Sequence, residues 1–361
     1  MNAFVISDTL IISVDWLDFT VKDPAFDIYR VMEFLGFDRS MFVDCEHGAR
    51  GYKNMCKLSG YEVSILSDGQ PDMGIHVSIS GSDVSYVLGK YAASQYCHSQ
   101  PFSDDLCSED FNSDHVLQHI LRSIREIGNV TRLDLALDDK KPYFTPAKLN
   151  EYCQKGCLKT KFRSARYEHG FKPSSYESTG DTLYLGKRGS KGSGIFLRVY
   201  DKQLEHNSKN PDDLITEPWI RWEFEITDTR ANAVADLISA SENIGDVYFG
   251  ILNNYISLID TSADQNRSRC PMLPEWSDFI EHVKPLHLYC IPEPKTLADK
   301  ENWLVSQCAP TFGLLSQIKG LDYAISIIES GCTRIKKSDW ELASVEMGKR
   351  AMESKERCYD S

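Results

Sequence analysis

Three segments of the chain alternate apolar and charged or polar residues at every second position. They are "RLDLALD" at residues 132–138, "IFLRVYDK" at 195–202 and "IRWEFEI" at 220–226. In a β-strand successive side chains point to opposite faces, so each segment would place its apolar residues on one face and its charged residues on the other. This repeated pattern predicts a sheet that packs one face against a core.

The remaining sequence predicts further strands and helices in an α+β order. The stretch "GYKNMCKLSGYEVSIL" has the pattern of a hairpin that turns at Ser59-Gly60, and "GIHVSIS" of a short strand. Other strands are expected at 9–18, 163–169, 181–187 and 194–202. Helices are expected at about 25–36, 113–127, 146–155, 229–241 and 245–259. Strands with interspersed helices and hairpin-like joins favour a mainly antiparallel sheet flanked by helices, with a helical C-terminal extension.

The length of 361 residues suggests two domains, or one large domain with an extension. We expect an α+β body over residues 1–270, with its motifs in 130–228, and a Pro-rich connection with a helical C-terminal region over 271–361. The last helix would begin at the capping box Ser338-x-x-Glu341.

Several absences in the sequence point to a protein of the cytoplasm. No run of eighteen apolar residues is present, so we expect no membrane span. The first residues lack a basic region, which argues against a secretory signal. The eleven cysteines are odd in number and irregularly spaced, as expected for reduced thiols.

Charge is distributed unevenly along the chain. The net charge is −13, which argues against a general nucleic-acid coat, but residues 157–205 hold ten Lys or Arg against five Asp or Glu and so carry +5. A basic island in an acidic protein predicts a confined anion site.

The polar faces of the alternating segments bring carboxylates beside arginines. If these strands are neighbours, the like charges repel, and a divalent cation would relieve the repulsion. Same-face residues two apart are separated by roughly 6.6 Å along a strand, so Asp134 and Asp138 are too distant to share an ion. Residues opposite each other on neighbouring strands are only about 5 Å apart. We therefore expect Asp134 and Glu223 as metal ligands, with Glu225 as a third, and oxygen ligands suit Mg²⁺ or Mn²⁺.

A glycine-rich loop, "YLGKRGSKGSG" at 184–194, precedes the strand that carries Tyr200 between Arg198 and Lys202. Its backbone N–H groups and cations are suited to wrap an oxyanion, although it lacks the GxxxxGK[ST] pattern of a P-loop. Taken alone, it has the composition of a flexible hairpin turn. The candidate phosphate-binding residues are Lys187, Arg188, Lys191 and Arg221.

The motifs "TRLDLALDD", "YLGKRGS", "FLRVYDKQLE" and "WIRWEFEI", in this order, resemble the replication initiation proteins of small rolling-circle plasmids and filamentous phages. The resemblance covers about residues 130–228. The opening "SVDWLDFTV" and "GYKNMCKL" look like the phage-type members, and the tail from about 270 is similar only loosely. Each motif is weak singly, but four in order are fairly specific.

The resemblance implies transfer of a DNA strand to tyrosine. The family nucleophile corresponds to Tyr200, and its acidic, metal-dependent site to Asp134, Glu223 and Glu225. Nicking would leave a 3′-OH primer and a 5′-phosphotyrosine link that is later rejoined. The glycine-rich loop is a few residues longer than in plasmid members, and the His-hydrophobic-His motif of other initiators is absent.

The residues suit this chemistry independently of the resemblance. A phenol pKa of about 10 is too high for a good nucleophile at neutral pH, and Arg198, Lys202 and another cation nearby would favour the phenolate.

Two other functions fit the same residues. One is a non-enzymatic origin-binding or regulatory protein, and the other is a metal-dependent DNA hydrolase that forms no covalent adduct. The partners implied by the resemblance are origin DNA, single-stranded or extruded as a hairpin, and the host helicase and replication machinery. The resemblance is also compatible with a homodimer.

Overall fold

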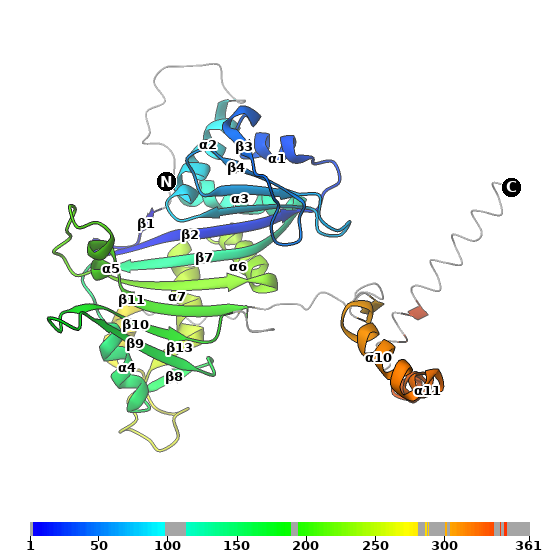
Figure 1. The fold of residues 1–361 in the computed structure, drawn as a ribbon. Coiled ribbons are helices and arrows are strands. Elements are labelled where there is room, and N and C mark those ends of the chain that lie inside the picture. The colour runs from blue at the N-terminus through cyan, green and yellow to red at the C-terminus, as the bar shows by residue number, and fades with distance from the viewer. Residues whose placement is uncertain are drawn as a thin grey trace. The chain divides into compact units, whose positions relative to one another are not determined.

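An antiparallel sheet of eleven strands forms the framework of residues 1–290 (Figure 1). Ten strands run in the order β3-β4-β5-β6-β2-β7-β12-β11-β10-β9, and β1 pairs with β2. The strands are β1 (Ala3–Val5), β2 (Leu10–Val21), β3 (Phe42–Asp44), β4 (Asn54–Leu58), β5 (Val63–Ser67), β6 (Ile75–Ser80), β7 (Gly128–Asp139), β9 (Ala165–Phe171), β10 (Ser178–Leu185), β11 (Ile195–Asp201) and β12 (Ile220–Thr227). The predicted mainly antiparallel α+β fold is confirmed.

The computed structural model describes residues 3–97, 113–188, 194–280, 286, 288, 300–301, 304–335, 340 and 343–344. The chain divides into two compact units, residues 1–290 and 291–361.

Helices and a small second sheet complete the first unit. The helices are α1 (Ile28–Phe34), the 3₁₀ turn η1 (Arg39–Met41), α2 (Asp83–Cys97), α3 (Ser113–Ile127), α4 (Pro146–Gln154), α5 (Lys202–Lys209), α6 (Asp228–Ala240), α7 (Ile244–Tyr255) and α8 (Pro274–Phe279). The second sheet pairs β8 (Leu158–Thr160) with β13 (Ile256–Leu258). Thr145 caps α4 as its side chain accepts a hydrogen bond from the Lys148 N–H, and Pro146 follows, as expected at a helix start.

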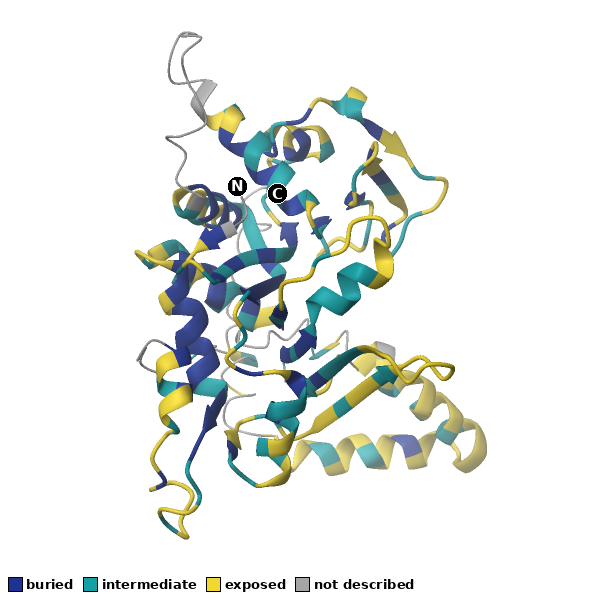
Figure 2. Ribbon diagram, turned by 90° about the vertical axis from the view of Figure 1, so that its left-hand side faces the viewer, coloured by how far each residue is buried: buried dark blue, intermediate teal, exposed yellow. Residues whose placement is uncertain are grey.

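The three alternating segments are neighbours at the centre of the sheet, in the order β7-β12-β11. Their apolar residues, among them Leu135, Leu197 and Phe224, are fully buried. Figure 2 shows that buried residues follow the strands and the helices of the first unit. The period of two in the sequence therefore identifies the core-facing side of the sheet.

Two predicted elements end earlier in the structure. The helix expected over 245–259 stops at Tyr255, because Ile256–Leu258 turn into β13 and pair with β8. The strand expected over 194–202 stops at Asp201, whose carboxylate accepts a hydrogen bond from the Leu204 N–H and caps α5. Lys202 is therefore the first residue of a helix.

The second unit is helical where the structure describes it. It contains the π-helix η2 (Leu304–Cys308), α10 (Ala309–Lys319) and α11 (Leu321–Cys332). Most of its described residues are exposed, and Ala324 is the buried one among those described (Figure 2). The capping box at Ser338 and Glu341 lies outside the described residues. Within the parts of the chain described, no helix is long and apolar enough to cross a membrane.

An aromatic cluster attaches α8 to the sheet of the first unit. Trp276 and Phe279 of α8 are fully buried. The Trp222 ring of β12 lies 6.2 Å from Trp276 and 5.0 Å from Phe279, measured between ring centroids. Residues beyond 270 thus contribute to the core behind the central strands.

We predict that Trp276→Ala lowers the free energy of unfolding by about 3 to 5 kcal/mol, as expected when a large aromatic side chain is removed from a packed core. Chemical denaturation measures this. The control is Tyr176→Ala at an exposed aromatic residue, which should change the free energy by less than about 0.5 kcal/mol. Equal, small effects of both variants would show that α8 does not stabilise the sheet.

Candidate active site

The register of the central strands places the candidate residues in rows across the polar face. Arg198 of β11 lies opposite Glu223 of β12, and Glu225 lies opposite Asp134 of β7. Glu223 lies opposite Ala136. The expected cross-strand pair of Asp134 and Glu223 is therefore wrong, because β12 runs two residues out of the assumed register. Asp134 faces Glu225.

Arg132 joins the Asp134 and Glu225 carboxylates. Its Nε and Nη2 donate to the two oxygens of Asp134 at 2.9 and 2.5 Å, and Nη2 lies 3.1 Å from Glu225 Oε2. The guanidinium carbon of Arg132 lies 4.1 Å from the ring centroid of Trp16. Arg132 therefore supplies positive charge between two buried carboxylates.

Burial raises the pKa of Asp134 to about 7. The hydrogen bonds and charge of Arg132 oppose this, but the Glu223 and Glu225 carboxylates add to the increase. The ionised form of Asp134 is thus disfavoured even beside Arg132. Additional positive charge close to Asp134 would favour its ionised form.

Tyr200 is linked to Arg198 through Glu223. The Tyr200 hydroxyl donates to Glu223 Oε2 at 3.3 Å, and Arg198 Nη2 donates to both Glu223 oxygens at 2.6 and 2.7 Å. The Arg198 guanidinium carbon also lies 5.0 Å from the Tyr200 ring centroid. Glu223 is thus oriented by an arginine and accepts a hydrogen bond from the phenol.

The Tyr200 phenol is protonated in this arrangement. Burial, followed by the Glu223 carboxylate, raises its pKa well above the ordinary value, and Arg221 and Arg198 offset this only in part. The neighbouring arginines thus lower the pKa of Tyr200, in the expected direction, but burial and the Glu223 carboxylate outweigh them in the DNA-free molecule. The spacing of residues in the sequence revealed the cations near Tyr200, but not the burial of Tyr200 or its contact with Glu223.

Arg221 is committed to carboxylates. Its Nε and Nη2 donate to Asp138 at 2.6 and 2.8 Å, and Nη1 lies 3.3 Å from Asp15. Trp219 Nε1 also donates to Asp138 at 2.7 Å. Since all three nitrogens of Arg221 already have carboxylate partners, this geometry favours a role in holding Asp138 rather than in binding phosphate.

Lys202 approaches Tyr200 from the start of α5. Its Nζ lies 5.7 Å from the Tyr200 ring centroid and 2.6 Å from Glu205 Oε2. Lys202 is therefore near Tyr200 although it belongs to the helix that follows the strand.

The described part of the glycine-rich loop brings two cations to the same face. Arg188 Nη2 lies 2.8 Å from Glu225 Oε2, and its guanidinium carbon lies 5.4 Å from the Phe196 ring centroid. Lys187 is exposed beside it. Lys191 lies outside the described residues.

Sequence reasoning missed Arg132 and Trp16 as parts of the site. Arg132 is two residues from Asp134 on the same strand, and this spacing places both side chains on one face. The spacing alone could therefore have identified Arg132 as part of the site. Trp16 lies opposite Asp134 only because the register of β2 against β7 shifts between Val14 and Trp16. No local pattern predicts such a shift.

Two of the three expected metal ligands lie opposite each other in the sheet. In the parts of the chain that the structure describes, no group of three or more His, Cys, Asp or Glu side chains is arranged to hold a metal. Asp134 and Glu225 do face each other, and Mg²⁺ is commonly bound by one or two carboxylates together with substrate phosphates. Glu223 has both oxygens on Arg198. The other two carboxylates are also paired, Asp134 with Arg132 and Glu225 with Arg132 and Arg188. A cation would therefore have to share these oxygens with the arginines.

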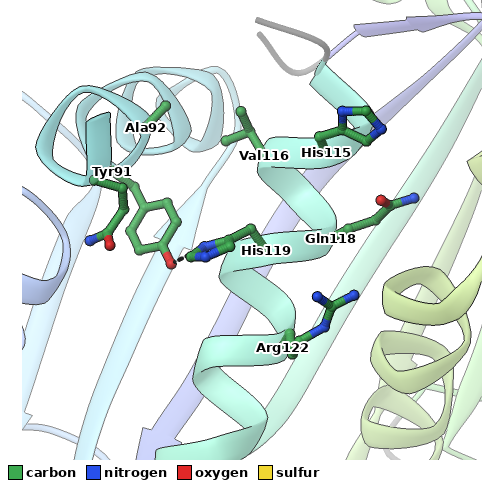
Figure 3. Close-up of a pocket in the computed structure, with 8 residues that line it drawn as sticks. Tyr91, Ala92, His115, Val116, Gln118, His119 and Arg122 are labelled. Carbon is green, nitrogen blue, oxygen red and sulfur yellow. Dashed lines mark hydrogen bonds between the residues drawn. The ribbon is translucent and has the colours of Figure 1, made fainter. Parts of the chain in front are cut away.

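A cavity of about 410 Å³ between α2 and α3 lies apart from these residues (Figure 3). Figure 3 shows the Tyr91 hydroxyl directed at His119, whose Nδ1 is 2.7 Å away. Because α3 packs its apolar residues against the core side of the sheet, this cavity contains none of the candidate residues of the polar face.

Comparisons with known proteins identify the family of this chain. The model of the family described as "Replication initiation factor" matches residues 128–330, and this range includes Asp134, Tyr200, Glu223 and Glu225. The chain therefore belongs to the replication initiation factor family.

Two relatives extend the match toward the N-terminus. A Bacillus subtilis (strain 168) protein described as "Putative DNA relaxase NicK" is 27% identical over 313 residues, which cover 86% of this chain and 82% of that protein. The solved structure of a rolling circle replication initiator protein from Geobacillus stearothermophilus is similar with a TM-score of 0.62 and 27% identity, over 78% of this chain and 99% of that one.

We predict that Asp134→Asn changes how stability depends on pH. The folded chain holds the Asp134 proton up to about pH 7, whereas the unfolded chain loses it near pH 4. Wild-type stability should therefore fall as pH rises between these values, by up to about 4 kcal/mol. Asparagine does not titrate, so the variant does not lose stability in this way. As pH rises, the unfolding free energy of Asp134→Asn should therefore increase relative to that of wild type.

Denaturation in EDTA at about pH 5 and pH 8 measures this difference. Asp38→Asn is the control, because the Ser40 hydroxyl and backbone N–H hold the pKa of exposed Asp38 below its usual value. Asp38 is thus ionised throughout this range, and its substitution should have the same effect at both pH values. A constant effect of Asp134→Asn would contradict the raised pKa.

Proposed function

We propose that this chain initiates rolling-circle replication by nicking and rejoining origin DNA through a covalent 5′-phosphotyrosine intermediate at Tyr200. The observation that carries the proposal is the hydrogen bond from the Tyr200 hydroxyl to Glu223, which Arg198 orients. Membership of the replication initiation factor family supports it, as do the relaxase and initiator descriptions of the relatives.

In the proposed reaction, the Tyr200 oxygen attacks the scissile phosphorus while Glu223 accepts the phenol proton. Since the phenol is protonated in the DNA-free molecule, proton removal must accompany attack, and a carboxylate within hydrogen-bond reach is suited to this. The bond from phosphorus to the 3′ oxygen breaks, and that oxygen is protonated to a 3′-OH. Reversal of the same steps rejoins the strand.

Asp134 and Glu225 would hold Mg²⁺ or Mn²⁺ together with the scissile phosphate. The bound cation would polarise the phosphate and balance the negative charge that develops on it. The raised pKa of Asp134 supports this assignment, because a group that is difficult to ionise without a counter-charge gains most from a cation.

The exposed cations beside the site are proposed to bind the DNA backbone. Lys187, Arg188 and Lys202 lie on or next to the polar face, and Lys191 belongs to the same loop. Arg221 is not assigned to the phosphates, because its three guanidinium nitrogens contact Asp138 and Asp15 and so support a role in positioning Asp138.

The proposed partners follow from this role. They are single-stranded or hairpin-extruded origin DNA and, in the cytoplasm, the host helicase and replication machinery. Exposed apolar side chains on α10 and α11, including Leu314, Ile318 and Ile328, support a protein partner for the C-terminal unit, either a host protein or a second copy.

We predict that Tyr200→Phe folds normally and binds origin DNA but forms no covalent adduct, because only the attacking hydroxyl is lost. A denaturing gel with a labelled single-stranded origin oligonucleotide and Mn²⁺ measures the adduct. Tyr167→Phe is the matched control, since Tyr167 lies opposite buried Leu183 on the core side of the sheet. A covalent adduct formed by Tyr200→Phe would contradict the proposal that Tyr200 is the nucleophile. Cleavage without any adduct would favour a hydrolase.

A second prediction separates the roles of the carboxylates. Excess EDTA should abolish cleavage, and Asp134→Asn or Glu225→Gln should require at least about tenfold more Mn²⁺ for half-maximal rate. Glu223→Gln should lose roughly 10²- to 10⁴-fold in rate, as expected for a general base, without a change in the Mn²⁺ requirement. Glu275→Gln, at an exposed glutamate, is the control. If Glu223→Gln also required more Mn²⁺ for half-maximal rate, as the other two variants should, the result would indicate that Glu223 is a metal ligand as well.

A further inference from the structure

A second cavity lies on the polar face next to Arg198. It has a volume of about 520 Å³ and is lined by strands β9, β10 and β11 and by the loop that follows β10. The lining residues that matter to its chemistry are Arg166, Tyr184, Lys187, Arg188, Phe196 and Arg198. Within the described residues, its lining contains four cations and no carboxylate.

Aromatic rings form the floor of this cavity. Tyr184 and Phe196 stack with their ring centroids 5.9 Å apart and their planes at 26°. The register produces this platform, because Tyr184 lies opposite Arg166 on one side and Arg198 on the other. The Arg166 guanidinium carbon stands 4.6 Å from the Tyr184 centroid.

The cations around the platform differ in how firmly they are held. Glu223 and Glu225 fix Arg198 and Arg188 from the side of the acidic site. Arg166 pairs with Glu168 at 3.1 Å, but both side chains are largely exposed, Arg166 to 68%. Its guanidinium can therefore give way to a planar group that stacks on Tyr184. An aromatic platform edged by guanidinium groups matches a base and its adjoining phosphates.

We infer that this cavity is a stacking site for one unpaired nucleobase of the DNA strand next to the cleaved phosphate. The inference rests on the proposed function, since Arg198 lines the cavity and also orients the Glu223 carboxylate that meets Tyr200. In a duplex both faces of a base are already stacked, so only a base in single-stranded DNA can use the ring of Tyr184. The site therefore selects unpaired DNA at the nick.

The test compares binding of two probes by the full chain in EDTA, where no cleavage interferes. One probe is a short oligothymidine, and the other is an abasic deoxyribose-phosphate chain of equal length. Wild type should bind the oligothymidine roughly 5- to 150-fold more tightly, the range expected for stacking of one base on an aromatic ring. Tyr184→Leu and Phe196→Leu should reduce this preference toward equality, and Tyr184→Phe should keep it.

Binding of the abasic probe serves as the folding control, because a misfolded variant would lose it as well. Its dependence on salt should be the same in wild type and Tyr184→Leu, since the phosphate contacts remain. Equal affinity of wild type for both probes, or an undiminished preference in Tyr184→Leu, would overturn the inference. Failure of the adduct assay with wild-type protein would instead overturn the proposed nucleophile, so the two failures are distinguishable.

Discussion

Pairing between arginines and buried carboxylates on the polar face of the sheet is the interaction on which the site depends. Arg132 holds Asp134, Arg198 holds Glu223, and Arg221 holds Asp138. Removing one partner from such a pair leaves an unpaired buried charge, which typically costs about 3 to 5 kcal/mol. The pairs therefore fix the side chains of the site. Those that cross between strands, Arg198 with Glu223 and Arg221 with Asp138, also tie the central strands to one another.

The same pairs set the chemistry around Tyr200. Arg198 uses both oxygens of Glu223, so that Glu223 presents a fixed carboxylate to the phenol and is withdrawn from the Asp134–Glu225 pair. In the proposed mechanism, Glu223 accepts the phenol proton, and the Asp134–Glu225 pair would hold the cation. The stacked rings of Tyr184 and Phe196 line the cavity next to Arg198, where we infer that an unpaired base of the DNA strand stacks.

Local periodicity was enough to predict the antiparallel sheet and its core-facing residues. Helix α3 was also predicted at its observed bounds, because its amphipathic pattern and polar flanks are local features. Register was not predictable, since it is set by turns and shifts far apart in sequence. This explains why Asp134 was paired with Glu223 and why Trp16 was missed. Burial of Tyr200, which reverses the expected direction of its pKa, depends on neighbouring strands as well.

The central claim is that Tyr200 becomes linked to the 5′ phosphate of the nicked strand. It is tested most directly by trapping wild-type protein on a single-stranded origin oligonucleotide with Mn²⁺, followed by proteolysis and mass spectrometry of the nucleotide-linked peptide. The account predicts a 5′-phosphodiester on the peptide that contains Tyr200 and a free 3′-OH on the released fragment. A link at another residue, such as Tyr184, or cleaved DNA with no linked peptide would contradict it.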